Sequence, residues 1–216
     1  MSGDYVAAME DVLDVYEEPY DPQRPVVCFD ETPRQLIAEV RTPEPMQPGM
    51  PPRQDCEYER HGVAEILLFC EPLSGQREAW VTEHRSKIEF AQMMQRIVQA
   101  YPEADVIRVV MDNLNTHKPG SLYEAFSPEK AHAILNKLEF HYTPKHGSWL
   151  NMAEIEFSAL SRMGLDRRTP DIDTLKRHVQ AWQTERNKAG VHIHWQFTTS
   201  KARETMSRCY PAQSTG

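Results

Sequence analysis

Long hydrophobic runs are missing from this chain of 216 residues. Its most apolar stretch, residues 66–70, falls far short of the roughly 20 residues that span a bilayer. The amino-terminal segment is acidic and lacks the basic region of a secretory signal. The four cysteines are widely spaced without a CxxC pair, which argues against a zinc knuckle or a disulfide framework. We therefore predict a protein of the reducing cytoplasm with no membrane partner.

Positive charge is also scarce, because the chain carries a formal net charge of −8. DNA affinity is built from Lys and Arg side chains that neutralise phosphates, so tight unaided DNA binding is not expected. The charge is unevenly distributed: residues 1–60 hold 14 acids and 5 bases, whereas residues 145–216 hold 7 acids and 11 bases. The carboxyl-terminal third therefore offers the basic face, and a bound cation would cancel part of the remaining negative charge.

The chain has neither a GxxxxGK[ST] phosphate loop nor a GxSxG elbow, which removes the usual nucleotide and serine hydrolases. It does place three carboxylates at informative points. Asp30 and Asp112 follow strand-like apolar runs, and Glu154 lies about one turn into a helical run that we expect to begin at Ser148. If the two strands are neighbours, the aspartates converge. Carboxylate oxygens suit Mg²⁺. Two such ions can bind the attacking and the leaving oxygen of a phosphoryl displacement. The pattern predicts phosphodiester chemistry.

Each of these residues also has a structural interpretation. An isolated aspartate at a strand end is commonly a turn residue, and Glu154 could be a solvated helix glutamate. Strand alternation and helix geometry should turn Glu31 and Glu156 away from the three carboxylates. Five nearby polar residues could contact DNA or support the site, although a loop or solvated turn explains most of them equally well: Asn113, His117, Lys145, His146 and Asn151.

Hydrophobic periodicity predicts an α/β fold in which helices flank a mixed sheet. Strand patterns cover residues 26–31, 62–72, 76–83, 106–111 and 138–143. Helical patterns cover residues 5–18, 86–100, 128–136, 149–163 and 172–188. We divide the chain into an amphipathic helix with its linker, residues 1–24, and one domain, residues 25–216. A proline-rich loop over residues 42–52 is either a surface connection or a contact for substrate or a partner chain.

Three segments carry a resemblance to a known family. They are the CFDET sequence around Asp30, the VMDNLNTH sequence from Val110 to His117, and the TPKHGSWLNMAE sequence that ends at Glu154. Together they resemble the catalytic domain of DDE transposases of the insertion-sequence 630 type, which are relatives of the mariner elements. The resemblance covers nearly the whole chain, and the Asn-x-x-Glu form of Asn151 and Glu154 is its most specific part.

This resemblance implies an RNase H-like fold in which Asp30, Asp112 and Glu154 are catalytic and bind two Mg²⁺ ions, for which Mn²⁺ can substitute. It implies DNA strand cleavage followed by attack of the freed 3′-hydroxyl on target DNA, so the partners are double-stranded element ends and target DNA. Because two ends must be brought together, it also implies a homodimer.

Family members begin with helix-turn-helix DNA-binding modules, and only a short acidic helix precedes Asp30 here. We therefore expect a catalytic part that works with a separately encoded DNA-binding subunit, or a truncated copy. Two alternatives to a transposase stay open: an RNase H-like nuclease without strand transfer, and a non-catalytic remnant that acts as an interaction or inhibitory module.

Overall fold

A computed structural model describes residues 2–41, 46, 48–49 and 56–211. Most of the expected proline-rich loop, residues 42–52, lies outside the described residues. In chain order the elements are α1 (Gly3–Glu17), β1 (Val26–Glu39), β2 (Tyr58–Glu71), β3 (Gln76–Thr82), α2 (Lys87–Ala100), β4 (Ile107–Met111), α3 (Gly120–Ala125), α4 (Pro128–Leu135), β5 (Leu138–Tyr142), the 3₁₀ turn η1 (Ser148–Leu150), α5 (Ala153–Met163), α6 (Ile172–Lys188), α7 (Thr199–Thr205) and the 3₁₀ turn η2 (Ser207–Cys209).

The strands form one five-stranded mixed sheet in the order β3-β2-β1-β4-β5. The chain makes an antiparallel meander through β1, β2 and β3, after which β4 returns to lie parallel to β1 and β5 parallel to β4. The predicted α/β class with a mixed sheet flanked by helices is confirmed. No helix among the described residues is both long enough and apolar enough to cross a membrane.

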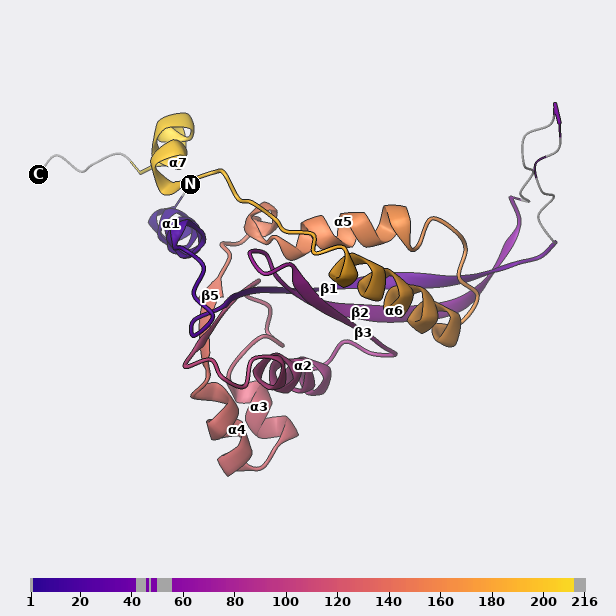
Figure 1. The fold of residues 1–216 in the computed structure, drawn as a ribbon, viewed down its shortest axis with the longest axis horizontal. Coiled ribbons are helices and arrows are strands. Elements are labelled where there is room, and N and C mark those ends of the chain that lie inside the picture. The colour runs from indigo at the N-terminus through magenta and orange to yellow at the C-terminus, as the bar shows by residue number, and fades with distance from the viewer. Residues whose placement is uncertain (1, 42–45, 47, 50–55, 212–216) are drawn as a thin grey trace, which may run out of the picture.

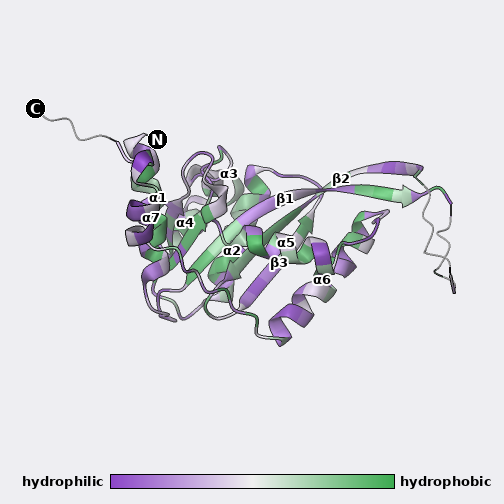
Figure 2. Ribbon diagram, turned by 90° about the horizontal axis from the view of Figure 1, so that it is seen from above, coloured by the Kyte–Doolittle hydropathy of each residue, from purple (hydrophilic) through white to green (hydrophobic). Residues whose placement is uncertain are grey.

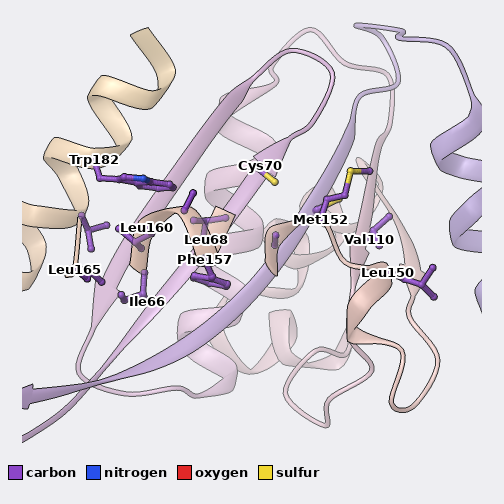
Figure 3. Close-up of a cluster of buried hydrophobic side chains, with 14 of the residues drawn as sticks. Ile66, Leu68, Cys70, Val110, Leu150, Met152, Phe157, Leu160, Leu165 and Trp182 are labelled. Carbon is purple, nitrogen blue, oxygen red and sulfur yellow. The ribbon is translucent and has the colours of Figure 1, made fainter. Parts of the chain in front are cut away.

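Helices cover both faces of the sheet (Figure 1). One face packs against α2, α3 and α4, and its core is built from alternate residues of β1 and β4 such as Phe29 and Val109. The other face packs against α1, α5 and α6, with Cys28 and Val110 pointing toward them. Figure 3 shows this second core, in which Phe157 and Leu160 of α5 meet Leu68 of β2. Alternation along the strands therefore decides which helices each side chain can reach.

The first strand is longer than its apolar run predicted. β1 continues from Glu31 to Glu39 and pairs with β2 throughout, with an irregularity between Gln35 and Ile37. Its pairing with β4 covers only residues 26–28, so Pro33, which lacks a backbone N–H, lies beyond this ladder and is tolerated. The two strands form an arm that extends from the body of the molecule (Figure 2). Polar residues dominate the arm, which is why the hydrophobic pattern ended early.

Two more expectations about local structure need correction. The helix expected from Ser148 begins at Ala153, because residues 148–150 form a 3₁₀ turn and Asn151 is extended with φ −85° and ψ 112°. The Ser148 side chain therefore does not cap this helix. The short helices α3 and α7 were not expected, whereas α6 spans the predicted residues 172–188.

Candidate metal centre between β1, β4 and α5

Asp30 and Asp112 lie side by side where β4 ends beside β1. The parallel register of β1 and β4 pairs Cys28 with Val110, so two residues further on the two aspartates come level with each other. Asp30 is 9% exposed and points to the α5 face, as Cys28 does two residues earlier. Asp112 is the first residue after β4. The structure therefore brings together the two carboxylates that the sequence placed at strand ends.

The Asp30 carboxylate is held by two donors. Its Oδ1 atom accepts a hydrogen bond from the backbone N–H of Glu31 at 2.9 Å, and Oδ2 accepts one from Nδ2 of Asn151 at 3.2 Å. Burial raises the pKa of Asp30 to about 7; the backbone N–H of Glu31 opposes this, and the negative charges of Asp112, Glu31 and Glu154 add to it. A buried carboxylate among like charges is a site where a cation would relieve both repulsion and desolvation.

Asn151 also sets the position of α5. Its Nδ2 donates to the backbone oxygen of Phe29 at 2.8 Å, while its Oδ1 accepts from the N–H of Ala153 at 3.1 Å. Its backbone oxygen accepts from the N–H of Glu154 at 3.1 Å. One buried side chain thus joins β1 to the first turn of α5, which carries the exposed Glu154 within electrostatic reach of Asp30. This gives a physical reason for the spacing of Asn151 and Glu154.

Asp112 is oriented by a buried histidine. Nδ1 of His117 lies 2.5 Å from Oδ1 of Asp112, and Nε2 lies 2.8 Å from Oε2 of Glu31. His117 is 1% exposed and stacks on Phe90 with ring centroids 4.9 Å apart. Burial lowers the pKa of His117, but the hydrogen bonds and charges of Asp112 and Glu31 outweigh it and raise that pKa to about 9. The ring is therefore a cation between two carboxylates at neutral pH.

This arrangement refines the sequence analysis of Glu31. Its side chain does lie on the face opposite to Asp30, as alternation predicted, yet through His117 it supports Asp112. Glu156, in contrast, is fully buried and pairs with Arg186 at 2.6 Å and Arg77 at 3.1 Å. It points away from the three carboxylates, as expected.

The other polar candidates surround the site without contacting its carboxylates directly. Asn113 accepts a hydrogen bond from Nζ of Lys118. Lys145 and His146 are exposed on a tight turn closed by the N–H of Gly147 and the oxygen of Pro144, 2.8 Å apart. Asn113 and Lys145 line a cleft of about 330 Å³ against the beginning of α1. Larger cavities lie elsewhere, including one of about 690 Å³ between α6 and β3, the outer strand of the sheet on the side away from β4.

The donor set fits a hard divalent cation. Asp112, directly after β4, and Glu154 of α5 lie close enough to Asp30 of β1 to add to the rise in its pKa that burial causes. Oxygen ligands of this kind suit Mg²⁺ or Mn²⁺. In the part of the chain that the structure describes, no three His, Cys, Asp or Glu side chains are already gathered tightly around one point. Mg²⁺ commonly takes only one or two carboxylates and completes its shell with water and phosphate, so a loose arrangement is compatible with it.

The chain is similar to known proteins in sequence and in fold. Residues 25–176 match the family model described as DDE superfamily endonuclease. The structure is similar to the pre-cleavage Mos1 transpososome, with a TM-score of 0.60, 14% identity, and coverage of 97% of this chain and 63% of that one. It is also similar to the Mos1 mariner paired end complex with Mn, with a TM-score of 0.55, 15% identity, and coverage of 97% and 62%. No curated relative matches the chain.

The sheet order and the helices on both faces match an RNase H-like fold. The chain belongs to the DDE superfamily endonuclease family, a class of enzymes that cleave nucleic acids. It spans slightly less than two thirds of the length of the Mos1 chains that it resembles.

Proposed function

We propose that this chain is the catalytic part of a transposase of the insertion-sequence 630 type. It cleaves a DNA strand at an element end and joins the freed 3′-hydroxyl to target DNA. Asp30, Asp112 and Glu154 are its catalytic residues and bind two Mg²⁺ ions, for which Mn²⁺ can substitute. The observation that carries the proposal is Asn151, whose one side chain contacts both Asp30 and the first turn of α5 and so brings residues from β1 and α5 together.

Bound at these oxygens, Mg²⁺ would stabilise charge on the attacking and leaving oxygens of an in-line displacement. The protein residues position the reactants. Asn151 fixes the rotamer of Asp30, and the His117 cation holds the Oδ1 atom of Asp112. Lys118 and Lys145 lie beside this site and supply positive charge for the DNA backbone. Catalysis of this kind depends on positioning and charge rather than on a covalent protein intermediate.

The partners follow from this role. The substrate is double-stranded DNA that contains element ends, together with target DNA, and two ends require a homodimer. The neighbouring structures are of a transpososome and a paired end complex, which supports both proposals. The formal charge of −8 argues against tight DNA binding by these residues alone.

The test is strand cleavage of end-containing duplex DNA with Mg²⁺ or Mn²⁺. We expect Asp30→Asn, Asp112→Asn and Glu154→Gln each to abolish nicking. Glu129→Gln is a matched control, because Glu129 is also an exposed glutamate in the first turn of a helix, here α4. Wild-type protein that nicks no end-containing DNA with either metal would favour the non-catalytic remnant. Pre-cleaved ends separate the other alternative, since a nuclease without strand transfer gives no joined product.

A further inference from the structure

Trp149 is an exposed aromatic side chain close to the candidate metal centre, and packing in the hydrophobic core does not account for its exposed part. Trp149 is 43% exposed, although it lies only two residues before Asn151. Its ring is stacked against Trp195, with centroids 6.3 Å apart and an interplanar angle of 22°, and it meets Phe197 edge-on at 5.7 Å. Its Nε1 atom lies 3.4 Å from the hydroxyl of Tyr5. The indole is thus held in a defined position while much of it faces solvent.

The backbone that carries Trp149 is tightly constrained. His146 adopts a left-handed conformation with φ 65°, the one non-glycine residue among those described to do so. A side chain at Gly147 would come within 2.9 Å of three atoms of Pro144. Strain of this kind persists only where surrounding structure enforces it, and it is concentrated at functional sites. Here it presents Lys145 on one side of the turn and Trp149 on the other.

Tyr5 connects Trp149 to the cleft of about 330 Å³ beside Asp112. The cleft is lined mainly by aromatic, polar and charged side chains, among them Asp4, Tyr5, Asn113, Tyr142, Thr143 and Lys145. Asn113 directly follows Asp112, so the cleft opens at the same edge as the carboxylates. Its volume is in the range of small-ligand pockets, and amide, hydroxyl and carboxylate groups of this kind can hydrogen-bond the edge of a nucleobase.

We propose that this cleft and the exposed face of Trp149 bind an unpaired nucleotide of the DNA strand that adjoins the scissile phosphate. The proposal rests on the function proposed above. The occupant is a nucleotide because an aromatic face and polar groups lie beside Lys145 and Lys118, which suit its phosphate. It is unpaired because a base inside a duplex is already stacked on both faces and cannot lie on a side chain.

The experiment compares two short duplexes in EDTA, where no metal-dependent cleavage occurs. One is blunt, and the other ends in a single unpaired 2-aminopurine nucleotide. Stacking on an aromatic side chain makes binding tighter by roughly tenfold or more, so we expect that preference for the overhang and quenching of its fluorescence. Trp149→Phe, which keeps an aromatic face, retains both effects. Trp149→Leu, which keeps apolar bulk against Trp195, loses both.

Two further variants make the result decisive. Ala8→Leu narrows the cleft from α1 without adding an aromatic face, and it should also remove the preference even if Trp149→Leu proves unstable. Trp80→Phe is the control, because Trp80 lies on β3 under Arg96 at the far edge of the sheet. A wild type without preference for the overhang, or a folded Trp149→Leu that keeps it, overturns the inference. Cleavage is measured in a separate assay, so neither binding result decides whether the proposed transposase activity is correct.

Discussion

Nδ2 of Asn151 lies 3.2 Å from Oδ2 of Asp30 and 2.8 Å from the backbone oxygen of Phe29. Asn151 is 1% exposed, so removal of its side chain leaves the Phe29 oxygen and the N–H of Ala153 without this partner in a dry environment. We expect Asn151→Ala to lower the free energy of unfolding by about 1–3 kcal/mol per group left unpaired. Urea denaturation measures it. Asn113→Ala, at an exposed position, is the control and should change stability by less than about 0.5 kcal/mol.

The buried pair of Glu31 and His117 gives a second prediction. Both side chains are at most 2% exposed, and their charged atoms lie 2.8 Å apart. Breaking one partner leaves the other charge buried with a single partner, because His117 keeps Asp112 and Glu31 keeps Arg85 at 3.7 Å. His117→Gln and Glu31→Gln should therefore each destabilise the protein by about 1–3 kcal/mol. The double variant should be less destabilised than the sum of the two, which gives a coupling free energy of about 1 kcal/mol or more. Additive effects in this double-mutant cycle would contradict the ion pair.

Two glutamates of α5 should behave in opposite ways. Glu156 is fully buried between Arg77 and Arg186, so Glu156→Gln leaves two cations without their counter-charge and should cost about 3–5 kcal/mol. Glu154 is exposed, and Glu154→Gln should leave the metal-free stability within about 0.5 kcal/mol of wild type. Thermal unfolding in EDTA compares the two variants. A large loss of stability in Glu154→Gln would mean that this residue has a structural role.

Much of this architecture could be predicted from the sequence because apolar periodicity records burial. The runs before Asp30 and Asp112 predicted two strands, which the structure shows to be adjacent, and the periodicity of residues 172–188 predicted α6. The arm of β1 and β2 was missed because its side chains are largely solvated, so no hydrophobic pattern marks its length. The start of α5 was missed because Ser148 is a residue type that commonly caps helices, whereas the turn at Asn151 depends on its contacts with β1.

The environment of the site was harder to predict. Glu31 and His117 are 86 residues apart, and only the pairing of β1 with β4 brings them together. The spacing of Asp112 and His117 was visible, but a loop histidine explained it equally well. The roles of Asp30, Asp112 and Glu154 in metal binding and catalysis stay predictions that rest on their convergence.

Metal binding should appear as a gain in stability. A ligand that binds only the folded state stabilises it by about 2.7 kcal/mol at a hundredfold excess over its Kd. Mg²⁺ and Mn²⁺ should therefore raise the Tm of the wild type in a concentration-dependent way, and Asp30→Asn and Asp112→Asn should lose most of this response. Glu129→Gln should keep it. An equal rise in Tm for all four proteins would show that the ions bind elsewhere.

Stability should also depend on pH through Glu71, which is remote in sequence from the site. Glu71 is 3% exposed, and its Oε1 atom has no hydrogen-bond partner among the described residues. Burial raises the pKa of Glu71, an effect that the hydrogen bond from Ser74 and the nearby Tyr101 hydroxyl oppose. A carboxyl whose pKa is raised on folding stabilises the fold while it is protonated, and that contribution is lost as pH rises from about 4.5 through the pKa of the folded state.

Glu71→Gln keeps the shape of the side chain and removes this loss of stability. We therefore expect the variant to exceed the wild type in Tm at pH 8 by more than it does at pH 5, where wild-type Glu71 is nearer to its protonated form. Glu78→Gln on the neighbouring strand β3 is the control, because the Glu78 carboxylate is partly exposed and paired with Arg96 at 2.7 Å. Replacing it should give no such increase with pH. If the Tm difference between Glu71→Gln and the wild type were the same at both pH values, Glu71 would titrate alike in the folded and unfolded chains, and burial would not set its pKa.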